Sequence, residues 1–216
     1  MDTPRLSLKE RSSRDALEQA ILTAAEHVFA LHGYRGASVQ MIADRAGLPK
    51  ANVLYYMGSK QTLYLKLLNR MMTRWNAVLE DITPQSDPKE VLSSFIRTKM
   101  RLGQRYPEGS RLFAAEILAG APFLESYLEG ELRAWVESRA AVIREWSSMG
   151  KMDDVDPRYL IFLIWSSTQH YAEYGTQVRA ILGKERLNDT DIEAASAFLE
   201  RVILKGCGVV QPRVDG

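Results

Sequence analysis

Three polar side chains able to contact nucleic acid occur within six residues of each other, at Lys50, Asn52 and Tyr55. A lysine can donate to guanine O6 and N7 or to a phosphate, and an asparagine amide has the donor and acceptor pair that matches adenine. Tyrosine more often donates to phosphates, which fix register but carry no sequence information. This set predicts a surface that reads DNA.

Neighbouring side chains extend this candidate surface toward the DNA backbone. Ser38 and Gln40 begin the preceding predicted helix and Lys60 begins the following one, and helix N-termini favour anions. The predicted DNA-binding residues are Ser38, Gln40, Lys50, Ala51, Asn52, Tyr55, Tyr56 and Lys60. Two alternatives stay open, because one of the two tyrosines could pack between helices and Gln40 could be a solvated first-turn residue.

Two short apolar-periodic stretches must position these side chains. Residues 39–46 form the first stretch, Gly47 separates the two, and residues 50–57 form the second. Pro49 suits the start of a helix because proline has no N–H to leave unpaired. Two helices joined by a tight glycine turn are typical of a helix-turn-helix, whose second helix enters the major groove. We assign Ile42, Ala43, Val53 and Leu54 to the core of this domain.

The segment 38–60 resembles the N-terminal signature of the TetR family of bacterial transcriptional repressors. The matching residues are Ser38, Ile42, Ala43, Ala46, Gly47, Lys50, Tyr55, Tyr56, Ser59 and Lys60. Two positions depart from the family pattern: Pro49 replaces a capping serine, and Met57 replaces a phenylalanine. The resemblance implies a small DNA-binding domain joined to a larger helical domain that binds a small molecule.

Helical periodicity runs through the whole chain, and no strand pattern is found. With the topology implied by the resemblance, we expect an all-α fold of about nine helices. The expected parts are a flexible N-terminal arm at 1–13, a helix-turn-helix domain at 14–58, and a ligand-binding and dimerisation domain at 59–208 that opens with a connecting helix at 59–81. Within the larger domain we expect long helices at 88–105, 123–149, 157–182 and 190–205.

Charge is distributed unevenly along the chain. Residues 1–75 contain 11 Lys and Arg against 6 Asp and Glu, a net charge of +5, and the remainder contains 17 against 21, a net charge of −4. A basic first third favours a DNA-binding domain joined to a separate body, although chance scatter of surface charge is the alternative.

Other sequence features indicate in which compartment of the cell the protein is found. The single cysteine, Cys207, excludes an internal disulfide framework, and we expect neither a metal nor a cofactor. The polar N-terminus has no apolar segment typical of a signal peptide. The longest purely apolar run, at 159–165, is far shorter than the roughly 20 residues that span a bilayer. We therefore expect a cytoplasmic protein.

The last two predicted long helices have apolar residues on more than one face, which requires cover on both sides. These residues are Leu160, Ile161, Leu163, Ile164, Ile192, Ala195, Phe198, Leu199, Val202 and Ile203. Since one helix-turn-helix makes few base contacts, we expect a homodimer on a palindromic operator, paired through these two helices. Burial within a single chain is the alternative.

Two further stretches, 111–124 and 164–174, resemble the pyrimidine-utilisation repressors of the same family, which respond to uracil and thymine. The Gln169 amide could bind the N–H and C=O edge of a pyrimidine dione, and Trp165, four residues earlier, could cover the ring. Thr168 and Trp75 complete the predicted ligand-binding set. Core or interface packing is the alternative for these residues.

The sequence lacks the residue patterns typical of an enzyme. His27, His32 and His170 lack metal-ligand spacing, and neither a phosphate-binding glycine loop nor a G-x-S-x-G elbow is found, so we do not expect an enzyme. A helical adaptor that does not bind DNA, or the same regulator with a different effector, remain as alternatives.

Overall fold

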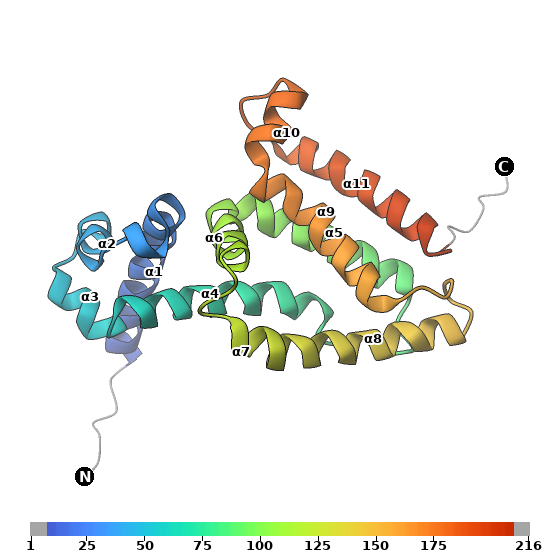
Figure 1. Cartoon of the computed structure of the whole chain (residues 1–216), viewed down its shortest axis with the longest axis horizontal. Helices are drawn as coiled ribbons and strands as arrows, with labels where there is room; N and C mark the ends of the chain where they lie inside the picture. Colours follow the sequence, from blue (N-terminus) through green and yellow to red (C-terminus); the bar gives the residue numbers. More distant parts are fainter. Residues whose placement is uncertain (1–7, 210–216) are drawn as a thin grey trace, which may run out of the picture. The chain divides into compact units, whose positions relative to one another are not determined.

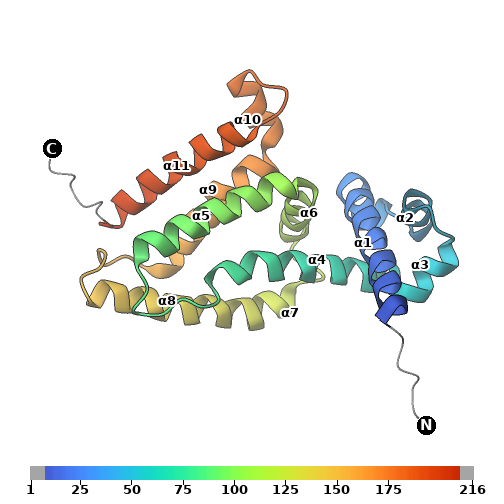
Figure 2. The same cartoon turned by 180° about the vertical axis from the view of Figure 1, so that it is seen from behind.

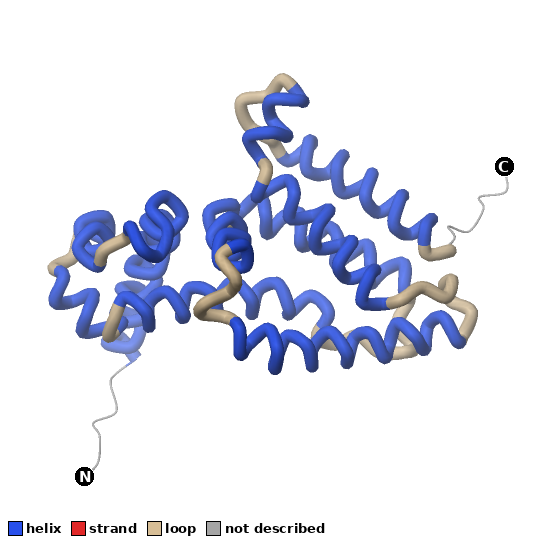
Figure 3. Tube along the Cα trace, in the orientation of Figure 1, coloured by secondary structure: helices blue, strands red, loops and turns tan. Residues whose placement is uncertain are grey.

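The computed structural model describes residues 8–209, with side chains for residues 14–209. All regular secondary structure in this range is helical (Figure 3). It contains ten α-helices of eight or more residues and no strand. The all-α prediction of about nine helices is therefore confirmed. The chain divides into two compact units, Met1–Met72 and Thr73–Gly216, which we call the N-terminal and the C-terminal unit.

The N-terminal unit is built on α1 (Leu8–Gly36), α2 (Val39–Ala46) and α3 (Lys50–Met57). Figure 1 shows these helices in blue and cyan. Gly33 interrupts α1 with a left-handed backbone (φ 64°, ψ 176°). Gly47 ends α2 in the left-handed conformation (φ 66°), and its N–H donates to the carbonyls of Ala43 and Asp44. Because glycine adopts this conformation without a Cβ clash, it allows the tight turn that leads into α3.

The core of the N-terminal unit forms where α1, α2 and α3 pack together, and the first part of α4 (Lys60–Asn76) joins it through Tyr64, whose ring meets that of Phe29 edge to face. Its buried side chains include Ile21, Ala25, Val28, Phe29, Ile42, Ala43, Val53, Met57, Leu63, Tyr64, Leu67 and Leu68. Met57, at the position where the family pattern has phenylalanine, is buried and fills this core.

The C-terminal unit contains a short 3-10 turn (Ala77–Leu79) and the helices α5 (Pro88–Arg105), α6 (Pro107–Leu118), α8 (Arg133–Ser148), α9 (Pro157–Glu173), α10 (Gly175–Leu182) and α11 (Asp189–Gly206). Helix α5 packs against both α9 and α11, and α8 packs against α9 (Figures 1 and 2). Asp87, Asp156 and Asn188 cap α5, α9 and α11 by accepting backbone N–H groups of their first turns.

The structure corrects three expected boundaries. The helix expected at 157–182 is two helices, because the chain breaks at Tyr174 (φ −102°, ψ 26°) before α10. The helix expected at 123–149 starts at Glu125 with a single turn, α7 (Glu125–Tyr127), followed by a π-helical turn at Leu128–Leu132 before α8. Helix α1 begins at Leu8, inside the expected arm at 1–13, whereas residues 1–7 lie outside the described range.

Candidate functional site

Helix α3 presents one face to its own core and the opposite face to solvent. Val53 and Met57, four residues apart, are buried, whereas Lys50, Asn52 and Tyr55 are exposed. Tyr55 is 80% exposed and lies opposite the buried pair in a helix of 3.6 residues per turn. Asn52 and Tyr55 thus share the solvent side of α3, whereas Lys50, at the first position of the helix, is exposed beside the buried stripe.

The two tyrosines of α3 differ in environment. Tyr56 is half-buried, its ring meets that of Tyr55 edge to face at 5.2 Å, and the Arg14 guanidinium lies 6.0 Å from its centre. Of the pair, Tyr55 is therefore free to reach a phosphate, and Tyr56 is the partly packed member.

The side chains at the start of α2 already have partners within the N-terminal unit. The Ser38 hydroxyl accepts the backbone N–H of Met41 at 3.2 Å and caps the helix. The Gln40 amide donates to the Asp44 carboxylate at 2.7 Å. Ser38 still has its own O–H to donate, whereas Gln40 is held beside a negative charge that would repel a phosphate. Their predicted DNA contacts remain predictions.

Lys60 is built into the N-terminal unit more deeply than the sequence suggested. Its ammonium donates to the carbonyls of Tyr34 at 2.9 Å and Ala37 at 3.0 Å, and it lies 4.5 Å from the centre of the Tyr34 ring. These bonds tie the start of α4 to the turn between α1 and α2. A phosphate contact by Lys60 therefore remains a prediction for its third donor.

The assignment of Leu54 to the core is wrong. Ile42, Ala43 and Val53 are buried as predicted, but Leu54 is 38% exposed. The apolar pattern does not show this difference because α3 buries only a narrow stripe, and Leu54 lies to one side of it.

In the C-terminal unit, a buried polar cluster contains the predicted ligand residue Gln169. Its amide donates to the Glu173 carboxylate at 3.1 Å, and the buried Ser110 hydroxyl donates to the same oxygen at 3.2 Å. The ammonium of buried Lys99 interacts with this carboxylate and lies 4.8 Å from the centre of the Trp75 ring. Trp75 also packs edge to face against Phe113 at 5.0 Å.

Burial shifts both charged groups of this cluster toward their neutral forms. Desolvation lowers the pKa of Lys99 to about 7, although the neighbouring Glu173 opposes part of that shift. Desolvation also raises the pKa of Glu173, against the hydrogen bond from Ser110 and the charge of Lys99. A buried amine beside a half-buried carboxylate, with their pKa values shifted toward each other, is typical of functional sites.

Lys99, Ser110 and Glu173 are the members of the cluster that sequence reasoning missed. One signal was available for Lys99. It follows Leu92, Phe95 and Ile96 on the buried stripe of α5, and a lysine on an apolar stripe is seldom fully buried without a specific partner. No local pattern marks Ser110, whose partner Glu173 lies on α9, and the contacts of Glu173 with Ser110 and Lys99 come from α6 and α5.

The remaining predicted ligand residues lie in different surroundings. The Trp165 ring stacks on Trp135 at 6.3 Å and contacts Phe162 at 5.9 Å, whereas the ring partner of Trp75 is Phe113. The Thr168 hydroxyl is buried and donates to the Ile164 carbonyl within its own helix at 2.6 Å. Trp75 and Gln169 thus belong to the polar cluster, and Trp165 belongs to a second aromatic group.

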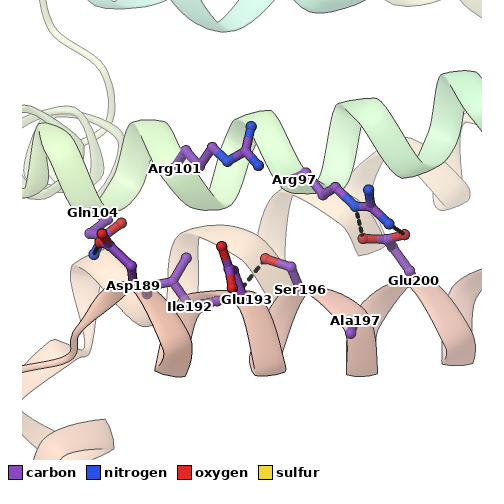
Figure 4. A pocket seen from close by; sticks show the side chains of 9 residues that line it. All are labelled: Arg97, Arg101, Gln104, Asp189, Ile192, Glu193, Ser196, Ala197 and Glu200. Atoms are coloured by element: carbon purple, nitrogen blue, oxygen red, sulfur yellow. Dashed lines mark hydrogen bonds and ion pairs between the residues drawn. The ribbon is translucent and has the colours of Figure 1, made fainter.

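A separate open groove of about 470 Å³ lies between α5 and α11 (Figure 4). In it, Arg97 forms two hydrogen bonds with Glu200, and Gln104 donates to Asp189. Its lining residues are Arg97, Arg101, Gln104, Asp189, Ile192, Glu193, Ser196, Ala197 and Glu200, and they include none of the four predicted ligand residues.

The described part of the chain contains neither a metal-binding cluster nor a membrane-spanning helix. Among the described side chains, residues 14–209, no group of three or more His, Cys, Asp or Glu is arranged to hold a metal ion. Over the same range, no helix has the length and apolar character needed to cross a bilayer.

Comparison with known proteins identifies the two parts of the chain. Residues 21–67 match the family described as bacterial regulatory proteins, tetR family, and residues 68–210 match the YcdC-like protein, C-terminal region. The chain is 37% identical over 205 residues to the HTH-type transcriptional regulator RutR of Escherichia coli, covering 95% of each. It is 24% identical to the HTH-type transcriptional regulator EthR of Mycolicibacterium smegmatis over 72% of each.

Solved structures share the fold. Transcriptional regulator SCO4942 from Streptomyces coelicolor superimposes with a TM-score of 0.69 at 25% identity, over 89% of this chain and 98% of that one. The ketosteroid transcriptional regulator KstR2 of Mycobacterium tuberculosis gives 0.66 at 19% identity, over 88% and 94%. The two family matches and the identity to RutR show that the chain belongs to the TetR family and is a DNA-binding transcriptional regulator, not an enzyme.

Proposed function

We propose that this regulator is a homodimeric repressor that binds a palindromic operator and is released by a small flat ligand such as uracil or thymine. The observation that carries the DNA-binding part is the solvent side of α3, where Asn52 and Tyr55 are exposed, with Lys50 exposed at the first position of the helix. Donors of this kind on a recognition helix suit base edges and phosphates in the major groove.

The buried cluster around Lys99 and Glu173 supports the ligand half of the proposal. The Gln169 amide uses one N–H on Glu173 and keeps its oxygen and a second N–H for a ligand. The Lys99 amine can donate to a ring carbonyl, and Trp75 offers an aromatic face. Flat rings with alternating N–H and C=O groups match these donors and acceptors. The similarity to RutR favours a pyrimidine among such rings.

Trp165 and Thr168 complete the proposed ligand set. Trp165 lies one turn before Gln169 on α9 and is half-buried, and in this proposal its ring turns from Trp135 to cover the ligand. Thr168 is fully buried and bonded to its own helix, and in this proposal it sets the shape of the wall.

Helix α4 offers a route from ligand to DNA. It is continuous from Lys60 to Asn76, with Trp75 near its end and Lys60 at its start. The Lys60 ammonium donates to the carbonyls of Tyr34 and Ala37, in the turn that leads into α2. A ligand beside Trp75 that shifts α4 would therefore also move the helix-turn-helix. In this proposal the ligand-bound form holds α3 in a position that does not fit the operator.

The dimer is proposed to form through the exposed faces of α9 and α11. Their other faces are buried in the C-terminal unit, at Leu160, Ile161, Ile164, Ile192, Leu199 and Ile203. About half of each of the side chains Phe162, Leu163, Phe198 and Val202 remains exposed, and Tyr159 is exposed as well. An apolar surface of this kind marks an interaction site, and a second copy of the same two helices would cover it isologously.

A ligand-release experiment tests the proposal with the full-length chain. A fluorescent duplex, selected by the protein from a random-sequence pool, is titrated with and without uracil, with adenine as the control ligand. We expect uracil to weaken duplex binding and adenine to have no effect. A ligand at about 100 times its dissociation constant should also stabilise the protein by about 2.7 kcal/mol.

The variant Gln169→Ala and its matched control Gln177→Ala sharpen this test, because Gln177 is an exposed glutamine on α10. Gln169→Ala should abolish the response to uracil and keep the duplex affinity, and Gln177→Ala should keep both. Duplex binding that no pyrimidine changes would contradict the ligand proposal. Loss of the dimer in Gln169→Ala would show that Gln169 is an interface residue.

A further inference from the structure

The solvent side of α3 has two chemically different edges. Residues three or four apart lie on the same side of a helix, so Ala51 and Leu54 form one edge, and Asn52 and Tyr56 form the other, with Tyr55 between them. Ala51 and Leu54 are both exposed, and Leu54 keeps 38% of its surface open to solvent. We call Ala51 and Leu54 the apolar edge of α3.

Charge is sparse on this helix. Lys50, at its first position, is the one charged residue between Lys50 and Met57. The side chains of α3 that can attract a phosphate are therefore Lys50 and, through its hydroxyl, Tyr55. The other exposed side chains are the amide of Asn52 and the apolar side chains of Ala51 and Leu54. A surface of this composition suits base edges better than phosphates.

An A·T base pair displays both groups that such a helix can recognise in the major groove. Adenine presents N6 and N7, which an asparagine amide can bind, and thymine presents its C5-methyl group, which an apolar side chain can contact. The thymine methyl is the one apolar group among the base-edge features of the major groove, so it is the natural partner of an exposed leucine on a recognition helix.

We infer that Leu54, supported by Ala51, is a specificity-determining residue that contacts a thymine methyl group in each half of the operator. The inference rests on the proposed DNA-binding function of α3 and extends it to the base that this edge reads. Leu54 is left uncovered by the core of the N-terminal unit because the stripe that α3 buries consists of Val53 and Met57. The duplex would then cover the part of Leu54 that its own domain leaves open.

The test replaces thymine with uracil at one position at a time in the duplex selected by the full-length protein. This change removes only the C5-methyl group and keeps base pairing. We expect about a four-fold loss of affinity for each half-site at the contacted position, which corresponds to about 0.8 kcal/mol for one methyl group taken out of water. Substitutions at other thymines should change the affinity by less than two-fold.

Two variants identify the side chain responsible. Leu54→Ala should bind the thymine and uracil duplexes equally. Leu31→Ala is the matched control, since Leu31 is 65% exposed on α1 of the same unit, and it should discriminate like the unmodified protein. Thermal unfolding of both variants checks that each is folded, and exposed leucines are not expected to affect stability strongly.

Tight, salt-sensitive binding that is insensitive to every uracil substitution would overturn this inference and leave the proposed function standing. Discrimination that persists in Leu54→Ala, or a selected operator without thymine in its half-sites, would overturn it as well. Failure to bind any duplex in a salt-sensitive manner would overturn the proposed function together with this inference.

Discussion

The two units of this regulator bring functional side chains together in opposite ways. In the N-terminal unit, Lys50, Asn52 and Tyr55 come from one eight-residue helix, and all three are exposed. In the C-terminal unit, Trp75, Lys99, Ser110 and Glu173 come from α4, α5, α6 and α9, and they already bind one another. The first surface is ready for a partner made of charged phosphates and base edges, whereas the second is a closed polar cluster suited to a small ligand.

This difference has an energetic consequence. Exposed side chains on α3 cost the folded protein little, so substitutions there should change DNA affinity and leave stability unchanged. In the cluster, Lys99 is buried and Glu173 is half-buried, and desolvation opposes both charges, so substitutions there should change stability and its pH dependence as well as ligand response.

The largest expected effect comes from breaking the proposed dimer. The double variant Phe162→Asp, Val202→Asp places charges on the exposed faces of α9 and α11. It should be monomeric by light scattering, and its operator affinity should fall by about 100-fold or more, because two linked α3 helices gain from effective concentration.

Leu118→Asp is the matched control for this double variant, since Leu118 is 83% exposed on α6 in the same unit. It should remain dimeric and bind the operator normally. A double variant that stays dimeric would show that other surfaces join the two copies.

The second effect concerns Lys99 and pH. Its folded pKa of about 7 lies below the ordinary value of a lysine in the unfolded chain, so between pH 7 and about 10 the unfolded state binds more protons. The free energy of unfolding should therefore rise with pH across this window, by at most about 5 kcal/mol. Lys99→Met should remove this rise, measured by urea unfolding at pH 7 and pH 9.

Lys205→Met is the control, because Lys205 is an exposed lysine near the end of α11, and this variant should keep the rise in the free energy of unfolding.

The raised pKa values of Tyr127 and Cys207 lower the free energy of unfolding as pH increases, but these two residues are present in all three proteins, so their effects cancel in the comparison. The raised pKa of Glu173 acts in the opposite direction to that of Lys99, because it lowers the free energy of unfolding as pH rises above the ordinary value of a glutamate. Equal pH dependence in the unmodified protein and in Lys99→Met would contradict the assignment of a neutral buried amine.

A third effect tests base reading by α3. Asn52→Ala should cost about 1–3 kcal/mol of operator affinity if the amide binds adenine, and the cost should disappear when that one base pair is changed. The measurement is a competition titration with operators altered at each position. An equal loss on every sequence would mean that Asn52 contacts the backbone.

The smallest expected effects come from replacing Lys60 and Lys50 of the N-terminal unit, which should differ in whether they change stability or DNA binding. Lys60→Met removes two hydrogen bonds to carbonyls and should lower the free energy of unfolding by about 1–3 kcal/mol. Lys50→Met removes an exposed charge and should leave stability unchanged while lowering the salt slope of DNA binding by about one. An unfolding midpoint unchanged by Lys60→Met would contradict its structural role, and a lowered salt slope would show a phosphate contact in addition.

The fold and the DNA-reading helix were accessible from the sequence because both depend on local patterns. Glycine at position 47, proline at position 49 and helical periodicity fix the turn and α3 within a short segment. Leu54 shows the limit of this approach, since periodicity distinguishes apolar from polar residues but not a buried leucine from an exposed one on a narrow helix.

The polar cluster was only partly accessible for a different reason. Gln169 and Trp75 could be named from the family resemblance, but Ser110 and Glu173 meet only because α6 and α9 pack together. At the break at Tyr174, the local signal is Gly175, which is buried as the first residue of α10, and a glycine within a helical pattern does not by itself show that the helix ends. Tertiary packing decided both features, and local propensity is a weak guide where packing decides.

The most direct test of the central claim is a guanine-N7 methylation footprint of the full-length protein on its selected duplex. The account predicts two protected major-groove patches, separated by one or more helical turns of about 10 base pairs, that weaken together when Asn52 and Tyr55 are replaced by alanine. Protection confined to a single patch, or two patches unchanged by these substitutions, would contradict a pair of α3 helices reading neighbouring turns of the major groove.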